Sequence, residues 1–242
     1  MNILLVNDDG FDAEGINRLR EVLKEFGTIY KVAPAVQQSG KSCSATFYTE
    51  IKGEKIDEFD YKVDGTPADC VQYACDNLPV KFDFVVSGCN RGLNCSFSSV
   101  WSGTIGACIH AGYLGLPSVA FSVVSNHFES IEKYAKIVMQ YILDNNLISK
   151  EAIISVNFPK GDAKGIKISE VDYDGFNFVI DQNEHIYLHK EKDGTVNFNF
   201  PNKDGDIYHL SQGYISIEPI GYNYCNRLLF DSLKSKAKDV DF

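Results

Sequence analysis

The chain has 242 residues, 44% of them hydrophobic and 23% charged, and these proportions exclude a disordered or fibrous protein. Its formal net charge of -10 at pH 7 argues against a surface that binds a nucleic-acid polymer, because neutralising a phosphate backbone needs clustered Lys and Arg. A small phosphorylated ligand, held by local dipoles and a metal ion, is compatible with this charge.

Cysteine usage and the N-terminus bear on the cellular compartment. There are seven cysteines, an odd number without a CxxC spacing, which favours reduced thiols over a disulfide framework or a structural zinc site. A strand is expected from residue 3 with no basic leader before it, and no apolar stretch reaches the length of a membrane span. We therefore expect a soluble, cytoplasmic protein that does not contact a membrane.

The first elements are predicted to form a β-α-β unit. The apolar run at 3–6 precedes a turn that ends in glycine, which is typical of a buried parallel strand. Apolar residues recur at helical spacing from Ile16 to Phe26, and Gly27 is expected to end that helix. A second apolar run at 28–32 predicts a strand parallel to the first.

The alternation of helices and strands continues to residue 158. Thr66 is expected to cap a helix, with Pro67 in its first turn and Asp69 at the positive end of its dipole. The later predicted elements are strands at 82–86, 118–123 and 153–158 and helices at 102–112 and 128–145. This pattern predicts an α/β protein with a mostly parallel sheet.

The sequence changes character near residue 159. From about 159 to 212 it is polar and aromatic, and the alternating segments 185–189 and 196–200 predict β-hairpins that project from the core. Exposed Phe and Tyr there suit contact with another subunit. A strand at 214–217 and a helix from about Asn226 close the chain. We expect a single domain over residues 1–242, with its core at about 1–158 and 213–242 and the extension at about 159–212.

Oxygen-bearing side chains follow three of the predicted strands. Asn7-Asp8-Asp9-Gly10 follows the first, a loop with Ser39 follows the second, and a loop at 87–92 with Asn90 follows the strand at 82–86. The carboxyl ends of parallel strands meet at one sheet edge, so these loops should converge. Their oxygens suit Mg²⁺, Mn²⁺ or Ca²⁺ better than Zn²⁺. In isolation the two adjacent acids are equally well explained as a turn that caps the next helix.

A fourth element is the segment Ser102-Gly103-Thr104 at the start of a predicted helix. Free backbone N–H groups and hydroxyl side chains in a first helical turn can hold a phosphate, and Gly103 allows close approach. On its own the segment is more simply explained as a helix cap.

Five motifs occur in order along the chain: NDDG, VAP followed by QSG, GTPADCV, VVSGCNRGLN and WSGTIGA. Together they resemble the SurE family of survival-protein nucleotidases from residue 1 to about 125, and DIYHLSQGYISIEPI resembles a late strand of that family. The resemblance implies a Rossmann-like three-layer core with a C-terminal β-hairpin extension used to form a homodimer or homotetramer. It also implies a 5′-nucleotidase that hydrolyses nucleoside 5′- and 3′-monophosphates to nucleoside and phosphate.

The resemblance also assigns roles to individual residues. It implies one Mg²⁺ or Mn²⁺ per subunit, with the metal ligands Asp8, Asp9, Ser39 and Asn90. It implies that the substrate phosphate lies near Asn7, Ser102, Gly103 and Thr104. The chain departs from the family pattern at Ala35, at 41–44 and at 95–99, so contacts around the metal set and to the substrate are expected to differ there.

The expected reaction needs a metal that polarises the phosphoryl oxygens, donors that hold them and a positioned water. Asp8 or Asp9 would orient or deprotonate this metal-activated water, and we favour Asp9, although the sequence leaves both open. A covalent aspartyl-phosphate is the rival mechanism, but the usual Asp-x-Asp spacing is absent. The alternative functions are a broader phosphatase or exopolyphosphatase and a non-catalytic, metal-linked nucleotide sensor.

Three further kinds of residue are given no catalytic role. Arg91 either meets phosphate or forms a structural ion pair, and Trp101 either packs against the helix or stacks on a base. No histidine stands in a metal-ligand pattern with an acid pair, and the histidines are His110, His127, His185, His189 and His209.

Overall fold

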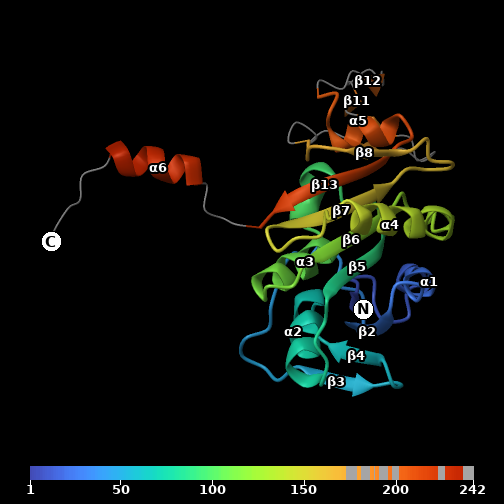
Figure 1. Cartoon of the computed structure of the whole chain (residues 1–242), viewed down its shortest axis with the longest axis vertical. Coiled ribbons are helices and arrows are strands. Elements are labelled where there is room, and N and C mark those ends of the chain that lie inside the picture. Colours follow the sequence, from blue (N-terminus) through green and yellow to red (C-terminus); the bar gives the residue numbers. More distant parts are fainter. Residues whose placement is uncertain are drawn as a thin grey trace.

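A nine-stranded sheet forms the centre of the protein (Figure 1). The computed structural model describes residues 1–172, 202–222 and 227–236, and also the backbone of four two-residue strands between residues 179 and 197. In spatial order the sheet contains β3 (Lys52–Lys55), β4 (Asp60–Asp64), β2 (Thr28–Pro34), β1 (Asn2–Val6), β5 (Phe84–Arg91), β6 (Ser118–Val123), β7 (Ala152–Phe158), β13 (Ile215–Gly221) and β8 (Ile166–Ile168).

The strands from β4 to β7 in this order are all parallel. β3 is antiparallel to β4, β13 is antiparallel to β7, and β8 is parallel to β13. The predicted α/β fold with a mostly parallel sheet is confirmed, and so is the parallel pairing within the first β-α-β unit.

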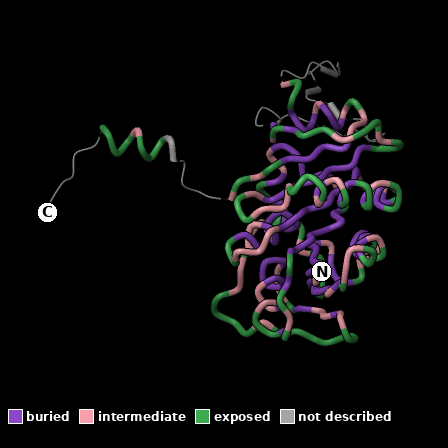
Figure 2. Tube along the Cα trace, in the orientation of Figure 1, coloured by how far each residue is buried: buried purple, intermediate pink, exposed green. Residues whose placement is uncertain are grey.

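Helices cover both faces of the sheet and make a three-layer structure. On one face lie α1 (Glu14–Leu23) and the continuous helix formed by η2 (Ile131–Ala135) and α4 (Lys136–Asp144); on the other lie α2 (Pro67–Asn77) and α3 (Gly103–Tyr113). β1 contributes Ile3 and Leu5 to the first layer and Leu4 and Val6 to the second. It is therefore buried on both sides, as its continuous apolar run predicted (Figure 2).

The predicted helix at 128–145 is present but contains a π-helical turn at η2. The predicted helix that starts at Ile16 ends at Leu23 instead of Phe26. Gly27 has a different role from the one expected, because a Cβ there would lie 2.0 Å from the carbonyl oxygen of Met1. Glycine is required at this position because the backbone of Met1 passes so close.

β5 is longer than predicted, because the expected loop at 87–92 continues the strand as far as Arg91. The register against β6 shifts between Ser87 and Asn90, which is a β-bulge. Gly88 has φ +127°, and a Cβ there would lie 2.3 Å from the carbonyl oxygen of Phe121. The bulge absorbs this irregular backbone, so Asn90 resumes pairing with β6 opposite Ser122.

Several elements were not predicted. The edge strand β3 is fully exposed and has the sequence KGEK, so it lacks the alternation that marks a half-buried strand. Within the expected extension, the short strand β8 joins the main sheet and the one-and-a-half-turn helix α5 (Asp206–Ser211) packs near β13. The other short helix, η1 (Ser96–Val100), lies between β5 and α3.

The remainder of the extension contains two small antiparallel pairs, as expected for hairpins. β9 (Val179–Ile180) pairs with β10 (Ile186–Tyr187), and β11 (His189–Lys190) pairs with β12 (Val196–Asn197). The surrounding residues lie outside the described part of the chain. The predicted C-terminal helix is present as α6 (Arg227–Lys236). No helix in the described ranges is long and apolar enough to cross a membrane.

α2 begins with the predicted cap, and its capping residues also hold the loop that leads from the Ser39 segment. The hydroxyl of Thr66 accepts the N–H of Asp69 at 3.1 Å, and a carboxylate oxygen of Asp69 accepts the N–H of Thr66 at 2.9 Å. The same buried carboxylate accepts hydrogen bonds from the N–H and the hydroxyl of Thr46, at 2.8 and 2.7 Å. One side chain thus stabilises a helix end and a loop.

We predict that Asp69→Ala lowers the free energy of unfolding by about 2 kcal/mol, because it leaves three partly buried donors of Thr46 and Thr66 without their acceptor. Urea unfolding followed by circular dichroism measures this. Asp76→Ala is the matched control, because Asp76 lies on the exposed side of the same helix and accepts one hydrogen bond from Gln72. Equal losses in the two variants would contradict the role given to Asp69.

Candidate active site

The candidate site lies at the carboxyl end of β1. β2 lies on one side of β1 and β5 on the other, so the strand order reverses here. Ligands of open α/β sheets bind outside the strand ends at such a point. Asp8 and Asp9 follow β1 directly, and Asn90 is the penultimate residue of β5. A hydrogen bond from the backbone N–H of Arg91 to Asp9 Oδ2, at 2.9 Å, joins the two segments.

Asp8 is buried against the N-terminus of α3. The residue is 3% exposed, and its Oδ1 accepts a hydrogen bond from the hydroxyl of Thr104 at 2.7 Å. A Cβ on Gly103 would lie 2.8 Å from the Cβ of Asp8, so glycine allows the helix to come this close. Burial raises the pKa of Asp8, while the hydrogen bonds from Thr104 and the backbone N–H of Gly103 oppose that rise. The helix dipole therefore stabilises this carboxylate.

Asp9 is only half-buried and is the more accessible of the two acids. Burial raises the pKa of Asp9 to about 6; the charge of Asp8 adds to this rise, while the N–H and the guanidinium of Arg91 oppose it. Its Oδ2 is held by Arg91, and Oδ1 accepts no hydrogen bond from the described residues. This oxygen is available to a water or a cation.

The side chain of Asn7 shapes the acidic turn. Its Nδ2 donates to the carbonyl oxygen of Gly10 at 2.9 Å, and its Oδ1 accepts the N–H of Gly10 at 3.3 Å. Because both polar atoms are engaged with the turn, a direct contact between this side chain and phosphate stays a prediction.

Ser39 and Asn90 supply the remaining predicted oxygens. The N–H of Gln38 donates to the carbonyl oxygen of Asp8 at 2.7 Å, which places the adjacent, exposed Ser39 beside the acidic turn. Asn90 is 9% exposed, and its Nδ2 donates to the carbonyl oxygen of Gly92 at 2.8 Å. This bond orients the amide and leaves its Oδ1 as a possible ligand.

The donor set fits a hard divalent cation. It combines two adjacent acids with raised pKa values, an amide oxygen and a hydroxyl, and such oxygens suit Mg²⁺ or Mn²⁺. No group of three or more His, Cys, Asp or Glu side chains placed to hold a metal occurs in the described ranges. A metal at this site therefore depends on the neutral oxygens of Ser39 and Asn90 as well as on the two acids.

The predicted phosphate turn caps α3. The hydroxyl of Ser102 accepts the N–H of Ile105 at 3.1 Å, and the N–H groups of Gly103 and Thr104 lie at the first turn, beside Asp8. The turn is thus both the helix cap and the neighbour of the acidic residues. The two explanations weighed from the sequence are compatible.

Residues that the sequence did not single out fix the Ser39 loop on this turn. Ser42 donates through its N–H to the carbonyl oxygen of Trp101 at 3.0 Å and through its hydroxyl to that of Val100 at 2.8 Å. A Cβ on Gly106 would lie 2.0 Å from the carbonyl oxygen of Ser42. A glycine inside a helix was the available signal for this contact. Ser42 belongs to one of the segments that depart from the family pattern.

Trp101 is 54% exposed, and its ring meets the edge of Phe97 at a centroid distance of 5.2 Å. It therefore leaves much of its surface open beside the predicted phosphate turn.

Arg91 has no carboxylate within 4.0 Å among the described residues, so the structural ion pair that the sequence allowed is not seen there.

The described histidines have partners away from Asp8 and Asp9. His110 contacts Gln72 at 2.9 Å, His127 contacts Glu129 at 2.9 Å, and His209 contacts Ser169 at 2.8 Å. His185 and the side chain of His189 lie outside the described part of the chain. The six described cysteines are free thiols; Cys225 lies outside the described residues.

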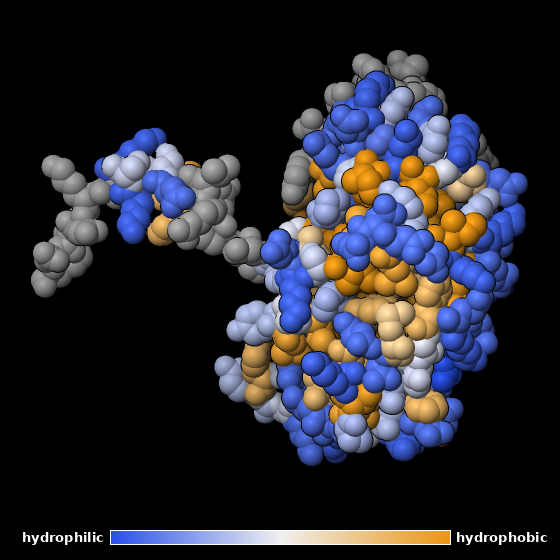
Figure 3. Space-filling model, viewed as in Figure 1, coloured by the Kyte–Doolittle hydropathy of each residue, from blue (hydrophilic) through white to orange (hydrophobic). Residues whose placement is uncertain are grey.

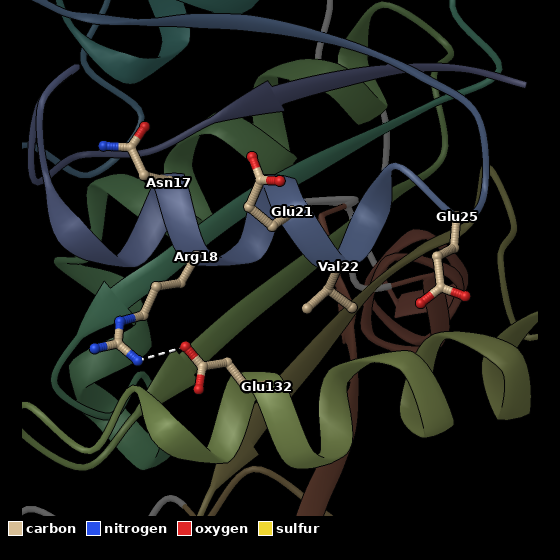
Figure 4. A pocket seen from close by; sticks show the side chains of 6 residues that line it. All are labelled: Asn17, Arg18, Glu21, Val22, Glu25 and Glu132. Carbon is tan, nitrogen blue, oxygen red and sulfur yellow. Dashed lines mark hydrogen bonds and ion pairs between the residues drawn. The ribbon is translucent and has the colours of Figure 1, made fainter.

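A pocket of about 500 Å³ between α1 and η2 does not coincide with the candidate site (Figure 4). Arg18 and Glu132 form an ion pair across it at 2.6 Å, and Glu21 and Glu25 also line it. Three of its six lining residues are acidic and one is basic, so the pocket is unsuited to a phosphate.

The comparison with protein families settles the family. The model described as "Survival protein SurE" matches residues 3–178. The chain belongs to the SurE family. This agrees with the resemblance carried by its five motifs and confirms it.

Individual SurE proteins match nearly the whole chain. A protein named 5′-nucleotidase SurE from Clostridium botulinum (strain 657 / Type Ba4) is 36% identical, over 93% of this chain and 95% of its own. One of the same name from Actinobacillus succinogenes is 36% identical, over 91% and 92%. The crystal structure of the SurE protein from Aquifex aeolicus is similar with a TM-score of 0.82 and 32% identity, covering 98% of this chain and 99% of that one.

We predict that Asp9→Asn stabilises the metal-free protein at pH 7. The folded-state pKa of Asp9, about 6, is above the value of 3.8 for a free Asp, so stability is lost as pH rises from about 4 to about 6. Removing the charge should raise the free energy of unfolding at pH 7 by about 1 kcal/mol, after allowance for solvent screening. Urea unfolding with a chelator at pH 4 and pH 7 measures this. A variant that is less stable than the parent at pH 7 would contradict it.

Proposed function

We propose that this SurE-family protein is a 5′-nucleotidase that hydrolyses nucleoside monophosphates to nucleoside and phosphate. The observation that carries the proposal is the contact between Asp8 and the first turn of α3 at the point where the strand order reverses. It brings an acid pair and a phosphate-binding helix end to one place. The names of the two relatives at 36% identity support the substrate class.

The two acids have different roles in this proposal. Asp8 is held by Thr104 and by α3, so it is a fixed ligand. Asp9 has an oxygen that accepts no hydrogen bond from the described residues, so it can orient the attacking water and accept its proton. Its hydrogen bond from Arg91 keeps the carboxylate oriented during that transfer.

The substrate phosphate is proposed to lie at the first turn of α3. The N–H groups of Gly103 and Thr104 and the hydroxyl of Ser102 are the donors there, and the helix dipole favours the negative charge. Because these donors are fixed by the helix and its cap, little reorganisation is needed as charge develops on the phosphoryl oxygens.

Asp8, Asp9, Ser39 and Asn90 are the proposed ligands of one Mg²⁺ or Mn²⁺ per subunit. When bound, such an ion supplies positive charge that polarises phosphoryl oxygens and lowers the pKa of water. Asn90 contributes to this set because its amide nitrogen is tied to Gly92, which fixes the direction of its oxygen. The covalent alternative is less favoured, because the oxygens of Asp8 are engaged by Thr104 and the helix N-terminus.

A panel of nucleoside 5′- and 3′-monophosphates should release phosphate in the presence of Mg²⁺ or Mn²⁺, and excess chelator should abolish release. Phosphate is measured colorimetrically, with polyphosphate included to test the broader phosphatase. If no substrate turns over with either metal, the enzyme proposal fails and the nucleotide sensor becomes the better explanation.

Asp9→Asn should lower kcat/KM for the best substrate by about 10²- to 10⁴-fold, because the proton acceptor and a metal ligand are lost together. The matched control is Asp12→Asn, which removes one charge from an acid three residues further on whose side chain is 79% exposed. Activity in the Asp9 variant close to that of the control would rule out the role of Asp9.

We also propose that the protein is a cytoplasmic homodimer or homotetramer and that the segment at 160–212 contributes to assembly. Hydrophobic residues gather on the middle of the face seen in Figure 3, and α6, which lies apart from the body in Figure 1, has Leu233 55% exposed. Such surfaces are typical of subunit contacts. The free thiols of the described cysteines suit the reducing cytoplasm.

Light scattering at micromolar concentration should show a dimer or tetramer, and replacing residues 173–201 by a short Gly-Ser linker should weaken assembly. A short linker can connect residues 172 and 202, because the β-bridge between Glu170 and Gly205 keeps the two flanking segments close together. Circular dichroism checks that the shortened chain folds. A monomeric parent chain would contradict the assembly, and an unchanged oligomer in the folded deletion variant would contradict the role of the segment.

A further inference from the structure

A second pocket, of about 300 Å³, lies on the far side of the sheet from β3 and β4, between the starts of β8 and β13 and the end of α5. Its lining residues are all cationic, aromatic or hydrogen-bonding: Lys164, Lys167, Tyr208, His209, Gln212 and Tyr214. No carboxylate lines it, although the whole chain carries a net charge of -10. The wall of this pocket is therefore positively charged, whereas the chain as a whole is negatively charged.

The two lysines of the pocket are not neutralised by acids in the described part of the chain. Neither has a carboxylate within 4.0 Å there; instead, both ammonium groups lie near the ring of Tyr214, at 6.0 Å for Lys164 and 5.2 Å for Lys167. A third ammonium group, from Lys203, lies 4.5 Å from the ring of Tyr208. The aromatic rings attract these ammonium groups without cancelling their charge.

His209 adds a buried imidazole ring to the same wall. It is 8% exposed, and its Nδ1 is engaged with the hydroxyl of Ser169 at 2.8 Å. Burial lowers the pKa of His209, and the charge of Lys167 lowers it further while Asp204 opposes this, so the ring is neutral at pH 7. A neutral ring has one proton, and the position of that proton decides whether the ring donates into the pocket.

A chain of hydroxyls lies behind the ring of His209. The hydroxyl of Ser216 lies 3.0 Å from that of Ser169 and also contacts the carboxyl group of Glu218. Burial raises the pKa of Glu218, which favours its protonated form. The hydroxyl of Ser216 donates to Glu218, and Ser169 holds the ring of His209 through Nδ1. The ring is therefore fixed in the wall of the pocket.

The pocket is separate from the candidate active site. β8 is four strands away from β5 in the sheet, and at about 4.8 Å per strand this is a distance of about 19 Å. Both sites lie at the carboxyl ends of the parallel strands, because β8 and β13 start beside the end of β7. A ligand in this pocket therefore does not contact Asp8 or Asp9.

We propose that this pocket is a second anion site that binds a phosphate-bearing ligand, with Lys164 and Lys167 as its charged donors and His209 in its wall. A pyrophosphate or polyphosphate chain and the phosphate tail of a nucleoside triphosphate both present the required chemistry, namely several adjacent anionic oxygens. The site needs no metal, and it does not depend on the activity proposed above.

Protection of lysines from acylation tests the site directly. The full-length protein, in excess chelator, is treated with an acylating reagent with and without pyrophosphate or a nucleoside triphosphate, and modification is quantified by mass spectrometry. Lys164 and Lys167 should be protected in a saturable way with half-protection below about 1 mM. Lys52 and Lys55 are the internal controls, because they lie on β3, which is the outermost strand on the other side of the sheet from β8. No protection, or equal protection of all four lysines, overturns the proposal.

Calorimetry with a variant pair gives the second measurement. Lys164→Ala/Lys167→Ala should weaken binding of the same anions in chelator by at least about tenfold, because two charged donors are lost. Lys52→Ala/Lys55→Ala removes the same charge, in the case of Lys55 also from near a Tyr ring, and should bind like the parent. Both lysine pairs are exposed, so both variants should fold. Tighter binding of pyrophosphate identifies an inorganic ligand and tighter binding of the triphosphate a nucleotide; equal binding by both variants overturns the site.

Discussion

The burial of Asp8 against the start of α3 is the constraint on which the candidate site depends. A carboxylate that loses its water resists ionisation, and burial alone would leave it protonated and a poor ligand. The hydroxyl of Thr104 and the backbone N–H groups of Gly103 and Thr104 replace part of the lost hydration. The helix can do this only because Gly103 lets it approach, and burial also raises the pKa of the neighbouring Asp9.

The sequence was sufficient where one residue type has one physical explanation. The apolar run of β1 is buried on both faces, and Thr66, Pro67 and Asp69 form the helix start that their order predicts. The convergence of the acidic turn with Asn90 followed from the parallel strands and is carried in the structure by the bond from Arg91 to Asp9.

The sequence was insufficient where backbone from a distant part of the chain decides the local conformation. The β-bulge in β5 depends on the closeness of Phe121, and the role of Gly27 depends on Met1. Exposed β3 and the short α5 offer no periodicity, because periodicity arises from burial over several turns or residues. The hydrogen bonds of Ser42 to Val100 and Trp101 could not be predicted either, because they join groups far apart in the chain.

The β-bulge in β5 links strand geometry to chemistry. Side chains of a strand alternate between the two faces of a sheet, so an extra residue that is paired regularly reverses the face of every later residue, whereas a bulge absorbs it. Between Ser87 and Asn90 the chain contains one residue more than the matching stretch of β6. If the same residues paired regularly with β6, Cys89 would oppose Ser122, and Asn90 would oppose Val123 on the opposite face of the sheet. The bulge therefore sets the face on which the amide of Asn90, a proposed metal ligand, lies.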